Sequence, residues 1–156
     1  MGAKVRVLDV ASRNGELVGD LHVSSVPVRG GLIEKETTAA LIDEIPVLAV
    51  LGAASEEGLT VRDARELRVK ETDRIATVAE NLRRMGVEAE ELPDGIVVPG
   101  RQRFHRAELD SFGDHRIAMA FAVAALAADG PSVIHHAEAA AVSFPEFYQT
   151  LRQVSL

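Results

Sequence analysis

The sequence of 156 residues contains one pattern of apolar and turn residues twice. A shift of 72 positions places residues 42–64 on residues 114–136 without a gap, so that Ile45 matches Ile117. Upstream, Met1-Gly2 matches Met85-Gly86 at a shift of 84, which indicates a longer hairpin in the first copy. A sequence that repeats in this way is predicted to fold as consecutive copies of one structural unit. We place these units at residues 1–84 and 85–156.

Each unit is predicted to follow the order β-β-α-β-α, which gives a mixed α/β (α+β) fold. Asn14-Gly15 and Pro93-Asp94-Gly95 predict hairpin turns, because these residue types accept the positive φ angles that tight turns need. The expected hairpins pair residues 4–9 with 20–25 and 87–92 with 95–99. The expected helices cover residues 44–55, 72–85, 115–128 and 145–154, and the expected short strands cover residues 59–63 and 132–136.

The helices at 44–55 and 115–128 are apolar nearly all round, which is typical of helices that are buried. The helix at 72–85 is amphipathic instead, with Ile75, Val78 and Leu82 on one face. We therefore expect buried helices beneath sheets. Because Met85-Gly86 ends a helix in the second unit, Met1-Gly2 is interpreted as the end of a helix whose remainder is absent, so the chain is expected to be truncated at its amino end.

The charge and composition exclude several classes of function. The net charge is −7, from 17 basic and 24 acidic residues, and a broad nucleic-acid surface needs an excess of Lys and Arg. The longest apolar stretch, residues 117–128, is too short to span a bilayer, so no membrane partner is expected. The chain has no cysteine, which excludes disulfides and a Cys nucleophile. We expect a cytoplasmic protein.

Charged residues precede both apolar helices. Asp43 stands before the first, and Asp114-His115-Arg116 opens the second. Asp is a preferred N-cap, so a purely capping role for Asp43 and Asp114 is equally compatible with the sequence. Arg116 differs, because a guanidinium at the positive end of a buried helix is unfavourable unless an anion shares the site. This position therefore predicts binding of an anion.

A second charged segment precedes the amphipathic helix. Glu71 and Arg74 lie at the leading edge of its apolar face, whereas Asp73 is placed to face solvent. The two could form an ion pair at i, i+3, which stabilises a helix by only about 0.2–0.5 kcal/mol. Turning such a pair inward costs more than that unless it borders a cleft. We therefore expect Glu71 and Arg74 to line a cleft.

Two long motifs carry a resemblance to a known family. They are Leu67-Arg68-Val69-Lys70-Glu71-Thr72-Asp73-Arg74-Ile75 and Gly113-Asp114-His115-Arg116-Ile117-Ala118-Met119-Ala120. Together with Leu92-Pro93-Asp94-Gly95 and Ser143-Phe144-Pro145-Glu146-Phe147, they resemble EPSP synthases along the whole chain. The resemblance implies the inside-out α/β barrel of the enolpyruvyl transferases, with this chain as the last two of three units in the carboxy-terminal domain. It also implies that an amino-terminal domain, absent from this chain, completes the active site.

The activity that the resemblance implies is transfer of the enolpyruvyl group of phosphoenolpyruvate to the 5-hydroxyl of shikimate 3-phosphate. No cofactor or metal is implied. The implied catalytic residues are Asp43, as a base on the 5-hydroxyl, and Glu71, which moves the proton at C3. Both also contact substrate. The further implied substrate-binding residues are Lys70, Arg74, His115 and Arg116, with Glu66 as a weaker candidate.

The sequence departs from the family pattern at one position and is compatible with two other functions. Val142 stands where some members have a phosphate-binding Lys. A domain like the enolpyruvyl transferase that acts on UDP-N-acetylglucosamine shares the fold, although the two long motifs argue against it. A non-catalytic binding domain of the same fold is a further alternative. Alone, the chain is expected to be inactive, because it holds only half of the implied active site.

Overall fold

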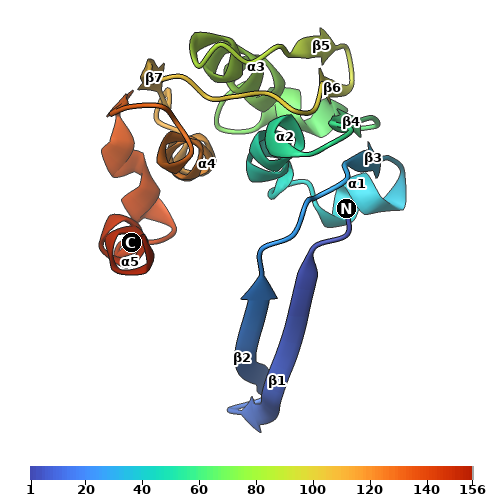
Figure 1. Ribbon diagram of the computed structural model, residues 1–156, viewed down its shortest axis with the longest axis vertical. Helices are drawn as coiled ribbons and strands as arrows, with labels where there is room; N and C mark the ends of the chain where they lie inside the picture. The colour runs from blue at the N-terminus through green and yellow to red at the C-terminus, as the bar shows by residue number, and fades with distance from the viewer. Residues whose placement is uncertain (156) are drawn as a thin grey trace.

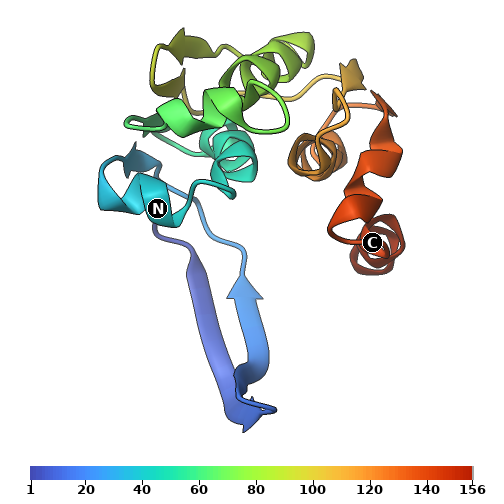
Figure 2. The same cartoon turned by 180° about the vertical axis from the view of Figure 1, so that it is seen from behind.

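The computed structural model describes residues 1–155, and it shows helices packed against small sheets, with one long hairpin that projects from this body (Figure 1). Seen from behind, the same hairpin extends away from all the helices (Figure 2). The strands are β1 (Lys4–Arg13), β2 (Glu16–Ser24), β3 (Gly31–Ile33), β4 (Leu59–Val61), β5 (Glu90–Leu92), β6 (Gly95–Val98), β7 (Glu108–Asp110) and β8 (Val133–His135). The helices are α1 (Glu36–Ala40), α2 (Ile45–Ala54), α3 (Arg74–Arg84), α4 (His115–Leu126) and α5 (Phe147–Val154), with 3-10 helices η1 (Arg65–Val69) and η2 (Ala137–Val142).

The main sheet has the strand order β3-β4-β6-β5. β3 and β4 run parallel, and β6 pairs antiparallel with both β4 and β5. The β5–β6 turn approaches β4 so closely that a Cβ atom on Gly95 would lie 1.9 Å from the carbonyl oxygen of Val61. Glycine is therefore required at the start of β6, and the turn is fixed against the end of β4.

The second half of the chain repeats the element types of the first. β7 and β8 form a parallel pair, as β3 and β4 do. α4, η2 and α5 follow in the same order as α2, η1 and α3. The mixed α/β class predicted from the sequence is confirmed by this arrangement. The unit boundaries at residues 84 and 85 stay a prediction.

The central helices α2 and α4 pack against each other, and each contributes four residues to the hydrophobic core. Ala49, Ala53, Ile117 and Ala124 are each at most 2% exposed, and such small side chains allow the helices to approach closely. The prediction of buried helices is confirmed, but one strip of each helix remains exposed. The large apolar residues of this strip that remain exposed are Val47, Leu51, Val123 and Leu126.

The β1–β2 hairpin has one apolar and one polar face. Val5 pairs with Val23, and Val7 pairs with Leu21, so these four side chains share a face. All four are more than half exposed. Asn14 and Gly15 form the turn with φ angles of 52° and 86°, as the sequence predicts. The strands run longer than the predicted ranges 4–9 and 20–25 because the pairing continues past a register shift between Leu8 and Ala11.

Several element boundaries differ from the sequence predictions. α3 begins at Arg74 rather than residue 72, because Asp73 caps it, and α5 begins at Phe147 rather than residue 145. The strands β3 and β7 and the short helix α1 were not predicted, since three to five residues are too few to show a period. None of the helices within residues 1–155 has the length and apolar character needed to cross a membrane.

Candidate active site

The amino-terminal ends of α2, α3 and α4 lie next to one another and bring together residues that are distant in the sequence. Asp43 lies two residues before α2, Arg74 is the first residue of α3, and Asp114 is the N-cap of α4. The sequence separations of the resulting contacts are 31 and 40 residues for Arg74 with Asp43 and Asp114. The convergence therefore depends on the tertiary fold.

Arg74 lies at the centre of this cluster. Its Nη1 donates to Oδ1 of Asp43 at 3.0 Å, and its Nη2 donates to Oε2 of Glu71 at 2.5 Å. Its Nε donates to Oδ2 of Asp114 at 2.8 Å. The side chain is only 1% exposed, whereas those of Asp43 and Glu71 are 40% and 50% exposed. Three carboxylates therefore share one buried guanidinium, and two of them also face solvent.

Asp114 is fully buried and has two tasks. As the N-cap of α4 it accepts a hydrogen bond at 2.8 Å from the backbone N–H of Arg116, and it also binds the Arg74 guanidinium and the Thr72 hydroxyl. Burial acts to raise the pKa of Asp114. The hydrogen bonds from Arg74, the Arg116 backbone and Thr72, together with the charge of Arg74, outweigh it, and the pKa lies below its ordinary value. Conversely, burial lowers the pKa of Arg74, but the hydrogen bonds and charges of Asp114, Glu71 and Asp43 together raise it by more. Both groups are therefore ionised.

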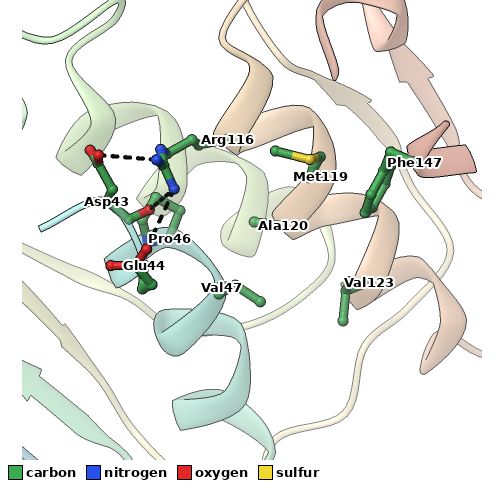
Figure 3. Close-up of a pocket in the computed structure, with 9 residues that line it drawn as sticks. All are labelled: Asp43, Glu44, Pro46, Val47, Arg116, Met119, Ala120, Val123 and Phe147. Carbon is green, nitrogen blue, oxygen red and sulfur yellow. Dashed lines mark hydrogen bonds and ion pairs between the residues drawn. The ribbon is translucent and has the colours of Figure 1, made fainter. Parts of the chain in front are cut away.

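Arg116 links this cluster to a cavity of about 210 Å³ (Figure 3). Its Nη2 lies 3.0 Å from Oδ2 of Asp43, and its Nη1 donates to the Asp43 carbonyl at 3.1 Å. Unlike Arg74, its side chain is 30% exposed. Asp43, Glu44 and Arg116 form the charged end of the cavity, and the rest of the lining is Pro46, Val47, Met119, Ala120, Val123 and Phe147.

The other predicted site residues lie beside this cluster rather than within it. Lys70 forms an ion pair with Glu66 across one turn of η1. Within residues 1–155, no hydrogen bond or ion pair joins that pair to Asp43, Glu71 or Arg74. His115 is the first residue of α4 and is half-buried, next to Asp114 and Arg116.

The structure corrects three expectations about these residues. Asp43 is not an N-cap, because the cap position of α2 is occupied by Glu44. Asp73 does not simply face solvent: it caps α3 by accepting from the Ala76 N–H, and it binds Arg68. Asp114 does more than cap α4, and sequence reasoning did not place it among the site residues. The signal that could have identified it is Arg74, a charge that faces inward and requires a buried partner.

The charge of the cluster limits what it can bind alone. Asp43, Glu71, Asp114 and Glu44, whose Oε1 lies 3.7 Å from Nη1 of Arg116, contribute four negative charges, and Arg74 and Arg116 contribute two positive charges. Arg74 is only 1% exposed and is bound by three carboxylates, so Arg116 is the guanidinium that a ligand can reach in this arrangement. An anionic ligand bound here would need further cations from outside this cluster.

Comparison with known proteins identifies the family. The family model described as "EPSP synthase (3-phosphoshikimate 1-carboxyvinyltransferase)" matches residues 1–151. A 3-phosphoshikimate 1-carboxyvinyltransferase of Solibacter usitatus is 68% identical over 155 residues, and one of Koribacter versatilis is 54% identical over 154 residues. Each match covers 99% of this chain but only 36% of the relative, so the chain spans about a third of the length of these relatives.

A solved structure gives the same result in three dimensions. The EPSP synthase from Acinetobacter baumannii superimposes on the whole of this chain with a TM-score of 0.92, at 35% identity, and 37% of that protein is covered. The fold, the projecting hairpin included, is thus similar to a segment of a larger protein. Sequence and structure agree, and this chain belongs to the EPSP synthase family.

Proposed function

We propose that this chain contributes part of the active site of a 3-phosphoshikimate 1-carboxyvinyltransferase. The observation that carries the proposal is the convergence of Arg74 and Arg116 on Asp43, each at 3.0 Å, with Glu71 on the other side of Arg74. These residues come from the two motifs that resemble those of EPSP synthases and from the segment before α2. Carboxylates and guanidiniums in contact, half open to solvent, suit proton transfer next to bound anions.

In the proposed reaction, the 5-hydroxyl oxygen of shikimate 3-phosphate bonds to C2 of phosphoenolpyruvate. Asp43 takes the hydroxyl proton, and Glu71, which enters this step as the carboxylic acid, delivers its proton to C3. Glu71 then removes a proton from C3 of the tetrahedral intermediate while the C2–O bond to phosphate breaks. Inorganic phosphate leaves with the proton that Asp43 took, both carboxyl groups return to their starting states, and the enol ether remains. Asp43 therefore handles the hydroxyl proton and Glu71 the proton at C3, and both side chains are partly exposed while bound to Arg74.

The binding roles follow from exposure. Arg116 holds the carboxylate of phosphoenolpyruvate, since its fork of donors suits bidentate binding and its side chain is accessible. Arg74 can reach that carboxylate only by giving up a bond to Glu71 or Asp43, so its first task is to fix the two acids. His115 borders the phosphoenolpyruvate site. Lys70 approaches the shikimate ligand, and Glu66 holds Lys70 in place.

The remaining cations are assigned to the part of the relatives that has no counterpart in this chain. Phosphoenolpyruvate and shikimate 3-phosphate carry two phosphates and two carboxylates between them, and the cluster described here has more negative than positive groups. In addition, Val142 supplies no charge and is 79% exposed. A preceding domain that faces the ends of α2, α3 and α4 would provide the missing positive charge.

A chimaera tests the proposal. In it, this chain replaces the matching segment of the Solibacter usitatus relative, which is 68% identical to it. We expect phosphate release from phosphoenolpyruvate that depends on shikimate 3-phosphate, and none from the 156-residue chain alone. A chimaera that unfolds cooperatively but releases no phosphate would count against the proposal, and turnover by the chain alone would contradict the half-site assignment.

A further inference from the structure

The loop that carries Lys70 and Glu71 joins η1 to α3. At its far end, the Arg74 guanidinium binds Glu71, as described above. Arg68 lies in the last turn of η1, just before this loop. It has no role in the proposed reaction and does not belong to the charged cluster. Its side chain is 26% exposed, and its hydrogen bonds are made to other parts of the chain.

Arg68 donates in three directions. Its Nη2 binds the carbonyl oxygen of Leu92 at 2.6 Å, and its Nε binds that of Pro93 at 3.2 Å. Its Nη1 binds Oδ2 of Asp73 at 2.8 Å. Asp73 is the N-cap of α3, so one guanidinium connects the β5–β6 turn to the first turn of that helix. A lysine side chain ends in one nitrogen atom, so it cannot reproduce contacts that three guanidinium nitrogens make.

The turn that Arg68 binds is itself fixed to the chain before η1. The carbonyl and the carboxylate of Asp94 accept hydrogen bonds from the backbone N–H groups of Ala64 and Asp63, at 2.7 and 3.0 Å. Gly95 lies against the end of β4. The turn therefore holds both ends of η1, and it gives the loop after η1 a rigid base.

The geometry points to Arg68 as a positioning residue for Glu71, an inference that rests on the proposed function. Glu71 lies between two arginine anchors, Arg74 within the charged cluster and Arg68 on the hairpin turn. Without Arg68 the loop keeps only the Arg74 end fixed, and the Glu71 carboxylate is no longer held at one place. A displacement of about 1 Å can lower a rate by about a hundredfold.

The test uses Arg68→Lys in the chimaera, with Arg83→Lys as the matched control. Arg83 binds the same hairpin, through the Ala89 carbonyl at 2.8 Å and Glu91 at 3.0 Å, but it lies at the far end of α3 from Glu71. We expect Arg68→Lys to lower kcat about ten- to a hundredfold, with a change in KM for phosphoenolpyruvate below about threefold. Arg83→Lys should leave both constants near those of the parent. Equal losses of kcat in the two variants would overturn the inference.

Amide hydrogen exchange without substrate provides a readout that does not depend on activity. Exchange at residues 69–73 should be faster in Arg68→Lys than in the parent or in Arg83→Lys. Unchanged exchange at residues 69–73 would overturn the positioning role of Arg68, whatever the activity. A parent chimaera that folds but is inactive would overturn the proposed function instead. If Arg68→Lys does not fold, Asp73→Asn removes the charge that Nη1 binds while keeping a good N-cap, and the same two measurements apply.

Discussion

Arg74 and Asp114 form a buried ion pair, with Nε 2.8 Å from Oδ2 and side chains that are 1% and 0% exposed. Each needs the other, because a buried charge without a partner pays a large desolvation penalty. The pair joins the first turns of α3 and α4 and thereby fixes the geometry of the whole charged cluster. Asp43 and Glu71 are held by the same guanidinium, so their positions also depend on this pair.

We expect Asp114→Asn to lower the free energy of unfolding by about 3–5 kcal/mol, the usual cost of removing one partner from a buried pair. Urea unfolding of the chain measures this. Glu80→Gln is the matched control, since it breaks the exposed pair of Glu80 and Arg84 on α3 and should cost only about 0.3–0.5 kcal/mol. Similar losses of unfolding free energy in the two variants would show that the buried pair stabilises the fold no more than an exposed pair does.

The stability of the chain should fall in acid, and Asp114 should account for part of the loss. Its pKa in the folded state lies below the ordinary value of 3.8, so the unfolded chain binds the proton more readily. Its contribution is therefore fully present above that value and is lost as the pH falls through the folded pKa. Unfolding measured between about pH 5 and pH 2 should show a smaller slope in Asp114→Asn.

Asp129→Asn is the control for this pH dependence. The pKa of Asp129 is also lowered, by its hydrogen bond to His105, but the group is exposed and screened by solvent. This variant should keep most of the parent's slope. If it flattens the profile as much as Asp114→Asn does, the acid sensitivity belongs to exposed carboxylates in general.

In the chimaera, Glu71→Gln should lower kcat by about 10²- to 10⁴-fold, the range that a general acid–base contributes. Because the amide keeps the shape and can still accept from Arg74, the KM values should change far less. Steady-state phosphate release measures both constants. Glu80→Gln again serves as the control, and a Glu71→Gln variant with parental kcat would remove Glu71 from the proton-transfer step.

Arg116→Lys in the chimaera should raise KM for phosphoenolpyruvate by about tenfold or more, since a charged hydrogen bond of about 1.5–3 kcal/mol is lost along with the bidentate geometry. The KM for shikimate 3-phosphate should change less. Arg84→Lys, on the outer face of α3, is the control. A uniform rise in both KM values would indicate that Arg116 supports the fold of the site rather than one ligand.

The fold class and most of the long elements could be predicted from the sequence, because apolar periodicity and turn residues are local signals. The residues of α2, α3 and α4 and the turn at Asn14-Gly15 follow from such signals. The strands β3 and β7 do not. Each has three residues, as β4 and β8 have, but no helix followed by a glycine marks its start in the sequence. The uncovered strip with Val47 and Val123 also escapes prediction, because hydrophobicity does not say which side of a helix finds a partner.

Within the candidate site, the sequence indicates which residue types are out of place but not what they bind. Arg116 stands out because a guanidinium at the start of an apolar helix needs an anion. Arg74 stands out because it lies at the leading edge of the apolar face of an amphipathic helix, where a charge needs a cleft or a partner. Their contact with Asp43 crosses 31 and 73 residues, so only the tertiary structure reveals it. Asp114 could not be identified as a site residue from the sequence, because a capping role already explains an aspartate at that position.

The amphipathic β1–β2 hairpin has a practical consequence for handling this chain. A two-stranded ribbon with an apolar face and open edges is a template on which further strands can add, so aggregation should begin there rather than in the helical body. Replacing the cross-strand neighbours Val7 and Leu21 by Lys and Glu keeps a favourable pair while it removes much of the apolar face. Light scattering should then show single chains at concentrations at which the parent forms larger particles.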